Sequence, residues 1–113
     1  MKIINETRNK VLAEEAAVAN TTFSRMQGLL GKSDLAQGQG LIIKPASSIH
    51  TFFMRFTIDA IFVDKHNRVI AIYPDMTSFR LSGLHLNASL VIELPAGVIR
   101  ATGTQVGNIV SMF

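Results

Sequence analysis

The sequence contains no cysteine among its 113 residues. This absence excludes disulfide bridges, thiolate metal ligands and cysteine nucleophiles together. Acid–base or nucleophilic chemistry would therefore fall to histidine, aspartate, glutamate or serine.

Long apolar runs are also missing. The first residues, Met1 to Glu6, do not resemble a secretion signal, and no later segment reaches the ~18 uncharged residues that a membrane-spanning helix needs. We therefore expect a cytoplasmic protein with no membrane partner.

Clusters of like charge are absent as well. Charged residues make up 17% of the chain, the net charge is +3, and the basic residues are scattered from Lys2 to Arg100. Nucleic-acid-binding domains concentrate their basic residues in a patch or stripe. The sequence therefore predicts no nucleic-acid partner.

Apolar residues, by contrast, are plentiful and fall into short segments. Hydrophobic residues form 48% of a chain whose length is typical of one domain, and no repeat or linker divides it. The pattern predicts an amphipathic helix within 22–30 and strands within 11–19, 41–43, 58–63, 69–73, 90–94 and 109–113. We expect residues 1–113 to form a single domain, mainly β with one short helix (α+β), built as a small antiparallel sheet or a barrel-like sheet.

The clearest local prediction is a hairpin. The polar stretch from Asp64 to Arg68 separates two β-branched runs, 58–63 and 69–73, and so short a polar interruption is typical of a hairpin turn. The block Ile49–Asp64, which leads into this turn, is the most apolar and aromatic part of the chain. We expect it to supply the core.

Several blocks occur in an order that is typical of one protein family. They are Arg25–Leu30, Gly40–Ile43, Ile49–Asp64, Leu90–Gly97 and Gly103–Asn108. Together they extend over nearly the whole chain, and the third, IHTFFMRFTIDAIFVD, carries the strongest likeness. On these residues the chain resembles the family called domain of unknown function 192, a group of uncharacterised bacterial and archaeal proteins.

The resemblance implies a compact, mainly antiparallel β domain with a short helix packed on it, here from a bacterial source. It implies no activity, because the family has none assigned. The chain departs from the family pattern at Thr57, where proline is common, and at Asn108, where aspartate is common. It also lacks the cysteine that many relatives carry just before the Ile-His-Thr triplet, so thiol chemistry is not required of this member.

Three ionisable residues lie inside the apolar block, namely His50, Arg55 and Asp59. A buried charge without a partner costs several kcal/mol, so these side chains should pair or line a cleft. In one unbroken strand, His50 would lie on one face and Arg55 and Asp59 on the other. One interpretation is that Arg55 and Asp59 form a structural ion pair across a bend near Thr57.

The alternative interpretation is a ligand-binding cleft. In it, Asp59 and His50 would act as acid and base, and Arg55 would hold an anion. The candidate ligand-binding residues are His50, Thr51, Met54, Arg55 and Asp59.

Glu93 is a further charged residue within an apolar strand. We expect it to form a structural salt link with Arg25, while Arg80, Arg100 and solvent remain alternatives.

The three histidines, His50, His66 and His85, lie far apart in the sequence and match no metal-ligand spacing. We therefore predict no metal site and no cofactor, and we expect His66 to be a solvated turn residue and His85 a loop residue.

The sequence leaves three hypotheses for function open. The first is a small non-enzymatic binding or accessory domain with a groove near Ile49–Asp64, which takes an unidentified small molecule or peptide. The second is a small hydrolase or lyase that uses Asp59 and His50. The third is a homodimeric structural module held together by exposed phenylalanines.

Overall fold

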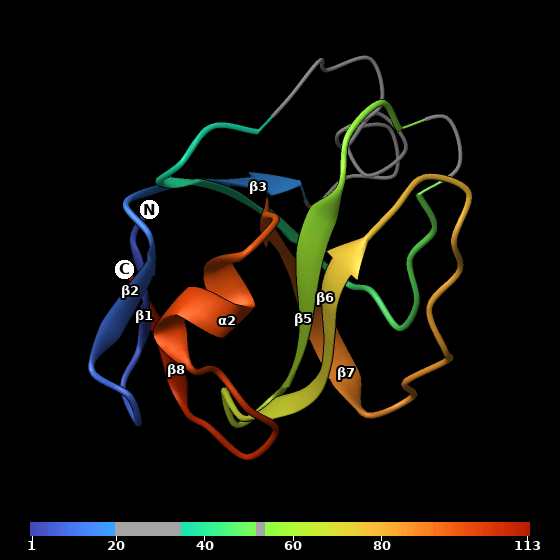
Figure 1. Cartoon of the computed structure of the whole chain (residues 1–113). Coiled ribbons are helices and arrows are strands. Elements are labelled where there is room, and N and C mark those ends of the chain that lie inside the picture. Colours follow the sequence, from blue (N-terminus) through green and yellow to red (C-terminus); the bar gives the residue numbers. More distant parts are fainter. Residues whose placement is uncertain (20–34, 52–53) are drawn as a thin grey trace.

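The computed structural model describes residues 1–19, 35–51 and 54–113, and their strands form two sheets (Figure 1). The smaller sheet has the order β2-β1-β8, and its strands are Ile3–Asn5 (β1), Lys10–Ala13 (β2) and Val110–Met112 (β8). Both of its pairs are antiparallel. The first and last strands are therefore neighbours, which brings the two ends of the chain side by side.

The larger sheet has the order β3-β4-β7-β5-β6. Its strands are Glu15–Ala19 (β3), Gln39–Ile43 (β4), Ile58–Asp64 (β5), Val69–Met76 (β6) and Ala88–Pro95 (β7). Its pairs are antiparallel except for β3 with β4, whose long connection gives the chain room for the crossover that parallel neighbours need. Each sheet has two edge strands, so the described strands form open sheets and no closed barrel. The predicted mainly β fold is confirmed.

The predicted hairpin is formed by β5 and β6. In its turn, Oδ1 of Asp64 accepts hydrogen bonds from the backbone N–H groups of His66 and Arg68, each at 2.9 Å. The Arg68 N–H, with that of His66, holds the pKa of the Asp64 carboxyl below its ordinary value. The second strand runs through Pro74 to Met76, further than predicted, because β6 is an edge strand and tolerates a residue without an N–H.

A short helix, α2 (Val98–Thr102), follows β7 and was not predicted. It is bounded by Gly97 and Gly103, whose positive φ angles of 99° and 67° suit glycine best. With five residues, the helix is too short to display a helical period in its sequence. The helix predicted within 22–30 lies outside the described residues.

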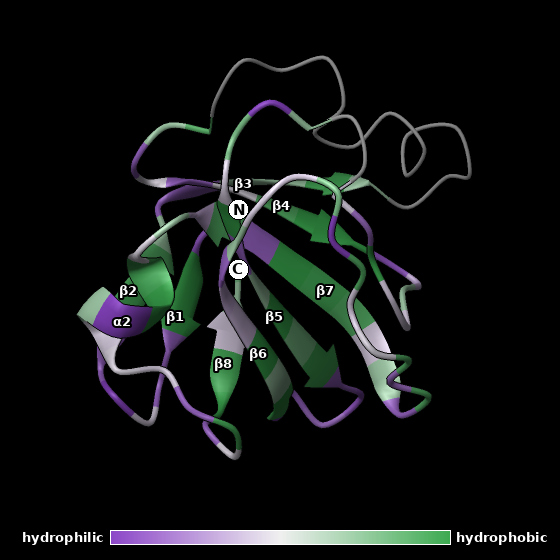
Figure 2. Cartoon of the chain, turned by 45° about the vertical axis from the view of Figure 1, so that its right-hand side comes forward, coloured by the Kyte–Doolittle hydropathy of each residue, from purple (hydrophilic) through white to green (hydrophobic). Residues whose placement is uncertain are grey.

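The larger sheet is buried on both faces. One face packs against the smaller sheet and α2 through a cluster that includes Ile3, Ile61 and Ile92. The other face carries a second cluster, with Phe62 and Val91 at its centre, and Figure 2 shows the apolar colouring concentrated along these central strands. Strand β5 is buried from its first residue to its sixth, so it supplies core as expected.

Two chain segments lie against each other beside the second cluster. Residues 49–51 pair with 79–82 through hydrogen bonds from Thr51 N–H to the Arg80 carbonyl (2.9 Å) and from Ser82 N–H to the Ile49 carbonyl (3.0 Å). His50 therefore belongs to this separate pairing, and β5 begins only at Ile58. The assignment of His50 to one face and of Arg55 and Asp59 to the other assumed one unbroken strand, which the chain does not form.

Candidate functional site

Asp59, on β5, has no exposed surface. Its Oδ1 accepts a hydrogen bond from the Asp75 N–H at 2.9 Å, and its Oδ2 accepts one from the Ile99 N–H at 2.7 Å. Asp75 lies near the end of β6 and Ile99 in the first turn of α2. One carboxylate therefore links β6 and α2 to β5, and these hydrogen bonds satisfy both of its oxygens.

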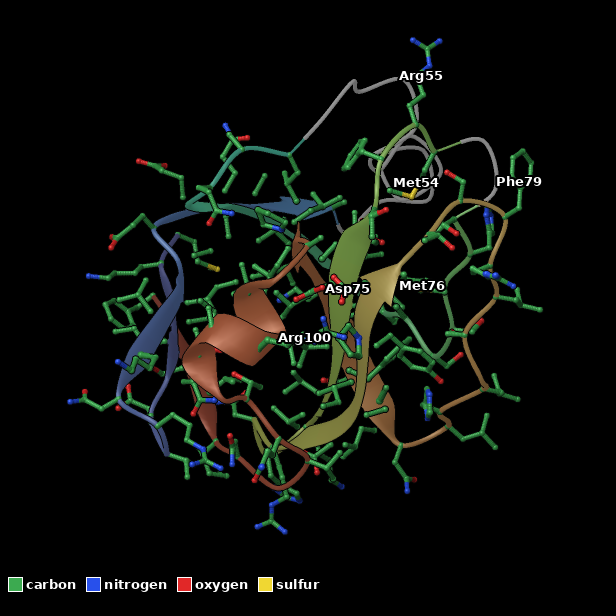
Figure 3. All side chains as sticks on the ribbon, in the orientation of Figure 1. Met54, Arg55, Asp75, Met76, Phe79 and Arg100 are labelled. Carbon is green, nitrogen blue, oxygen red and sulfur yellow. The ribbon has the colours of Figure 1, made fainter. Side chains whose placement is uncertain are left out.

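The ion pair expected between Arg55 and Asp59 does not form. Arg55 lies before the start of β5 and is exposed, with its side chain directed away from the sheet (Figure 3). The ion pairs within the described residues are Lys2–Glu14 at 3.6 Å and Asp75–Arg100 at 2.8 Å. The Asp59 side chain is hydrogen-bonded by two backbone N–H groups and not by an arginine side chain.

Thr51 is a positioning residue for the loop that follows β6. It is fully buried, and its Oγ1 donates to the Thr77 carbonyl at 2.5 Å and accepts from the Arg80 N–H at 2.9 Å. Met54, 7% exposed, packs into the second cluster, and its carbonyl accepts a hydrogen bond from the Ser78 hydroxyl. Both candidate residues thus hold the loop that begins after Met76.

His50 and Asp59 lie in different environments. His50 is exposed and faces Leu81 across the paired segments, whereas Asp59 is sealed within the protein. Their proposed roles as base and acid stay a prediction.

Glu93, on β7, is buried between Leu41 of β4 and Ala60 of β5, with 4% of its surface exposed. Burial raises the pKa of its carboxyl to about 7. Within the described ranges, no hydrogen bond or ion pair reaches this carboxyl, and its predicted partner, Arg25, lies outside them. The sequence identified the residue but did not show that the sheet encloses it.

Tyr73 and His85 form a contact that sequence reasoning missed. The Tyr73 Oη lies 2.8 Å from Nε2 of His85 and accepts a hydrogen bond from the Gly83 N–H at 2.9 Å. The His85 ring also packs against Phe62, with ring centroids 4.7 Å apart. His85 is therefore an anchor between the loop and the sheet, which its isolated position in the sequence did not indicate.

The loop held by these contacts presents large apolar side chains to solvent. Phe79, Leu81, Leu84 and Leu86 are 66%, 69%, 66% and 80% exposed, and we call these four side chains the apolar face. All four come from one loop, and groups of exposed apolar residues on a folded domain mark interaction sites. Sequence reasoning assigned this segment to a connection, because apolar residues that alternate with polar ones do not reveal which of them is buried.

Two segments that adjoin the apolar face contain no acidic residue. Neither 35–58 nor 76–92 includes an aspartate or glutamate, whereas Lys44, Arg55 and Arg80 lie within them. Each of these three cations is exposed. This charge bias was readable in the sequence, but only the structure shows that the two segments lie together.

An open hollow of about 430 Å³ adjoins the apolar face. It lies at the end of β6, and Asp75, Thr77, Arg80 and Leu81 are among its lining residues. A second hollow, of about 380 Å³, lies between β2 and α2. The first borders the segment that pairs with residues 49–51, so it is the described hollow nearest to the groove expected from the sequence.

Two structural features bear on cofactors and membranes. In the part of the chain that the structure describes, no three histidine, aspartate or glutamate side chains converge as metal ligands. None of the helices in these ranges has the length and apolarity to cross a bilayer. The predicted absence of metal and cofactor stays a prediction.

The strand order and the two core clusters define a small two-sheet domain with mainly antiparallel pairing. The chain belongs to the DUF192 family, described as uncharacterized ACR, whose model matches residues 3–112. The family assignment made from the sequence blocks is therefore confirmed.

Similar proteins support this assignment. A UPF0127 protein of Thermococcus gammatolerans is 31% identical over 96% of this chain and 73% of its own length. The UPF0127 protein PH1112 of Pyrococcus horikoshii is 29% identical over 98% of both chains. These relatives are archaeal, so they do not support the bacterial source that we expected.

Solved structures share the fold at low sequence identity. A protein of unknown function from Novosphingobium aromaticivorans has a TM-score of 0.87 and 19% identity, over 99% of this chain and 84% of that one. A structure from Sinorhizobium meliloti has a TM-score of 0.80 and 17% identity, over 97% of this chain and 89% of that one. At such identities the likeness concerns the fold alone.

Proposed function

We propose that this protein is a non-enzymatic binding module that docks through the apolar face. The observation that carries the proposal is the exposure of Phe79, Leu81, Leu84 and Leu86 on one loop. Burying such side chains against a partner removes apolar area from water, which is the main favourable term in association. The site thus lies on the segment that pairs with residues 49–51, beside the block from which a groove was expected.

The hydrogen bonds beneath the apolar face support this function, because they fix the loop before any partner arrives. The N–H groups of Phe79 and Arg80 bond to Thr51, and that of Ser82 bonds to Ile49. Preorganisation of this kind lowers the conformational entropy that docking would otherwise cost.

The charges around the loop favour an anionic partner. Lys44, Arg55 and Arg80 come from segments without acidic residues, and the Asp75 carboxylate nearby already pairs with Arg100. Complementary charge steers encounter and suppresses unsuitable partners.

The rival enzymatic function has less support. Both carboxylate oxygens of Asp59 already accept backbone hydrogen bonds, and a general base must reach the proton that it removes. His50, exposed on the paired segments, shares no contact with Asp59 in the described structure.

Site-specific photocrosslinking in cells that produce the protein tests the proposal. We would place benzoylphenylalanine at Leu84 or Leu86, with Val106, 60% exposed in the turn after α2, as the matched control. We expect adducts at both loop positions and none at Val106. Equal labelling at all three positions, or none at the loop, would contradict the docking function.

A further inference from the structure

We infer that the partner of the apolar face is the surface of an anionic lipid bilayer. This inference rests on the proposed function and specifies the partner. It departs from our expectation of no membrane partner, which rested only on the lack of a long apolar run. A domain that contacts a bilayer from one side needs no spanning segment, because a few protruding apolar side chains and nearby cations suffice.

The shape of the apolar face favours a bilayer over a peptide. Of the four side chains of the apolar face, Leu81 alone lines a described hollow, and Leu84 and Leu86 project into solvent with 66% and 80% of their surfaces exposed. Peptides are generally recognised in grooves with pockets for side chains. Lipid chains rearrange around a protruding leucine, so a bilayer requires no such pocket.

The backbone of the loop is suited to the membrane interface. Unsatisfied backbone groups are costly where water is scarce. Here the N–H of Gly83 bonds to the Tyr73 hydroxyl and the N–H of His85 to the Ser47 carbonyl, as those of Arg80 and Ser82 bond to the paired segment. The loop can therefore bring its leucines to a bilayer while these polar groups keep their partners.

The charge distribution selects an anionic surface and disfavours a second copy of the chain. Lys44, Arg55 and Arg80 are exposed in the acid-free segments. Two copies that met face to face would bring these cations together, and like charges across an interface oppose association. Phosphate headgroups would instead attract them, with about fivefold in affinity for each cation near the surface.

Co-sedimentation of the whole protein with lipid vesicles tests the inference. We expect binding to vesicles of equal parts phosphatidylglycerol and phosphatidylcholine, weak binding to pure phosphatidylcholine, and loss of binding as salt rises. The double substitution Leu84→Ser with Leu86→Ser should lower the partition coefficient at least ~10-fold. Val106→Ser, which removes an exposed apolar residue elsewhere, should leave it unchanged.

A charge-matched pair of variants separates local contact from overall attraction. Arg80→Glu should weaken binding to the anionic vesicles by about fivefold or more, and Arg68→Glu, in the distant hairpin turn, should weaken it less than twofold, although both change net charge equally. Thermal melts would show that each variant is folded.

The lipid inference is overturned if the protein does not bind the anionic vesicles, or if the loop variants bind as tightly as the control variants. Crosslinking in cells then separates the two proposals. If the vesicle tests fail but Leu84 and Leu86 still crosslink to a protein, the docking function stands and only the lipid partner is wrong.

Discussion

At the scale of single residues, the charged side chains of the core show how differently carboxylates can be buried. Both carboxylate oxygens of Asp59 accept hydrogen bonds from backbone N–H groups. Glu93 instead has apolar cross-strand neighbours, and burial raises the pKa of its carboxyl to about 7. The sequence identified both residues as unusual. It could not distinguish them, because their partners come from elements far away along the chain.

The raised pKa of Glu93 predicts a specific dependence of stability on pH. Because the folded pKa of about 7 lies above the model value of 4.5, the folded state binds the proton more tightly than the unfolded state does. The stabilisation is complete below about pH 4.5 and is lost as pH rises to about 7, with a total near 3 kcal/mol. Urea unfolding at several pH values across this range gives the free energy of unfolding of wild type and of Glu93→Gln. The two dependences on pH should diverge by roughly this amount, and parallel curves would refute the raised pKa of Glu93.

Asp59 and Arg55 offer a second comparison at this scale. Asp59→Ala should lower the free energy of unfolding by about 3 kcal/mol, because it leaves the buried N–H groups of Asp75 and Ile99 without acceptors. Arg55→Ala should change it by no more than about 0.5 kcal/mol, since the exposed arginine does not pair with Asp59. Chemical denaturation measures the free energy of unfolding of both variants. Equal decreases would support the Arg55–Asp59 ion pair, which is not formed in the structure.

At the scale of elements, local sequence signals predicted the parts that depend on neighbours in the chain. The turn at Asp64 identified the β5–β6 hairpin, and the apolar run at 90–94 identified β7. The helix α2 was not predicted, because the segment between its two flanking glycines is too short to show a helical period in the sequence. The apolar face was not predicted either, because the sequence alone is equally consistent with Leu84 and Leu86 as core residues. Only the structure shows that they lie outside the sheet and are exposed.

The loop after β6 should depend on its contact with Tyr73. Tyr73→Phe keeps the ring beside Phe62 but removes the oxygen that accepts the Gly83 N–H and contacts His85. Loss of one hydrogen bond of about 1 kcal/mol should speed amide exchange at Gly83 about fivefold. Amide exchange followed by NMR measures this change, and amides of the hairpin turn serve as the internal control. An unchanged rate at Gly83 would show that other contacts hold the loop.

At the scale of the whole molecule, the two faces of the larger sheet have different coverings. The smaller sheet and α2 cover one face, and the other lies beside the paired segments that carry the apolar face. The exposed cations of the acid-free segments should keep two copies apart. Light scattering at high protein concentration and low salt should therefore give the monomer mass. A dimer mass that returns to the monomer mass in Leu86→Ser would instead favour the homodimer hypothesis.

The most direct test of the docking surface is amide hydrogen exchange of the whole protein with and without phosphatidylglycerol vesicles. The account predicts slower exchange within 79–86 when vesicles are present and unchanged exchange in the turn 103–107, which lies outside the acid-free segments. Protection of 103–107 with none in 79–86 would contradict the central claim that this protein binds through the apolar face.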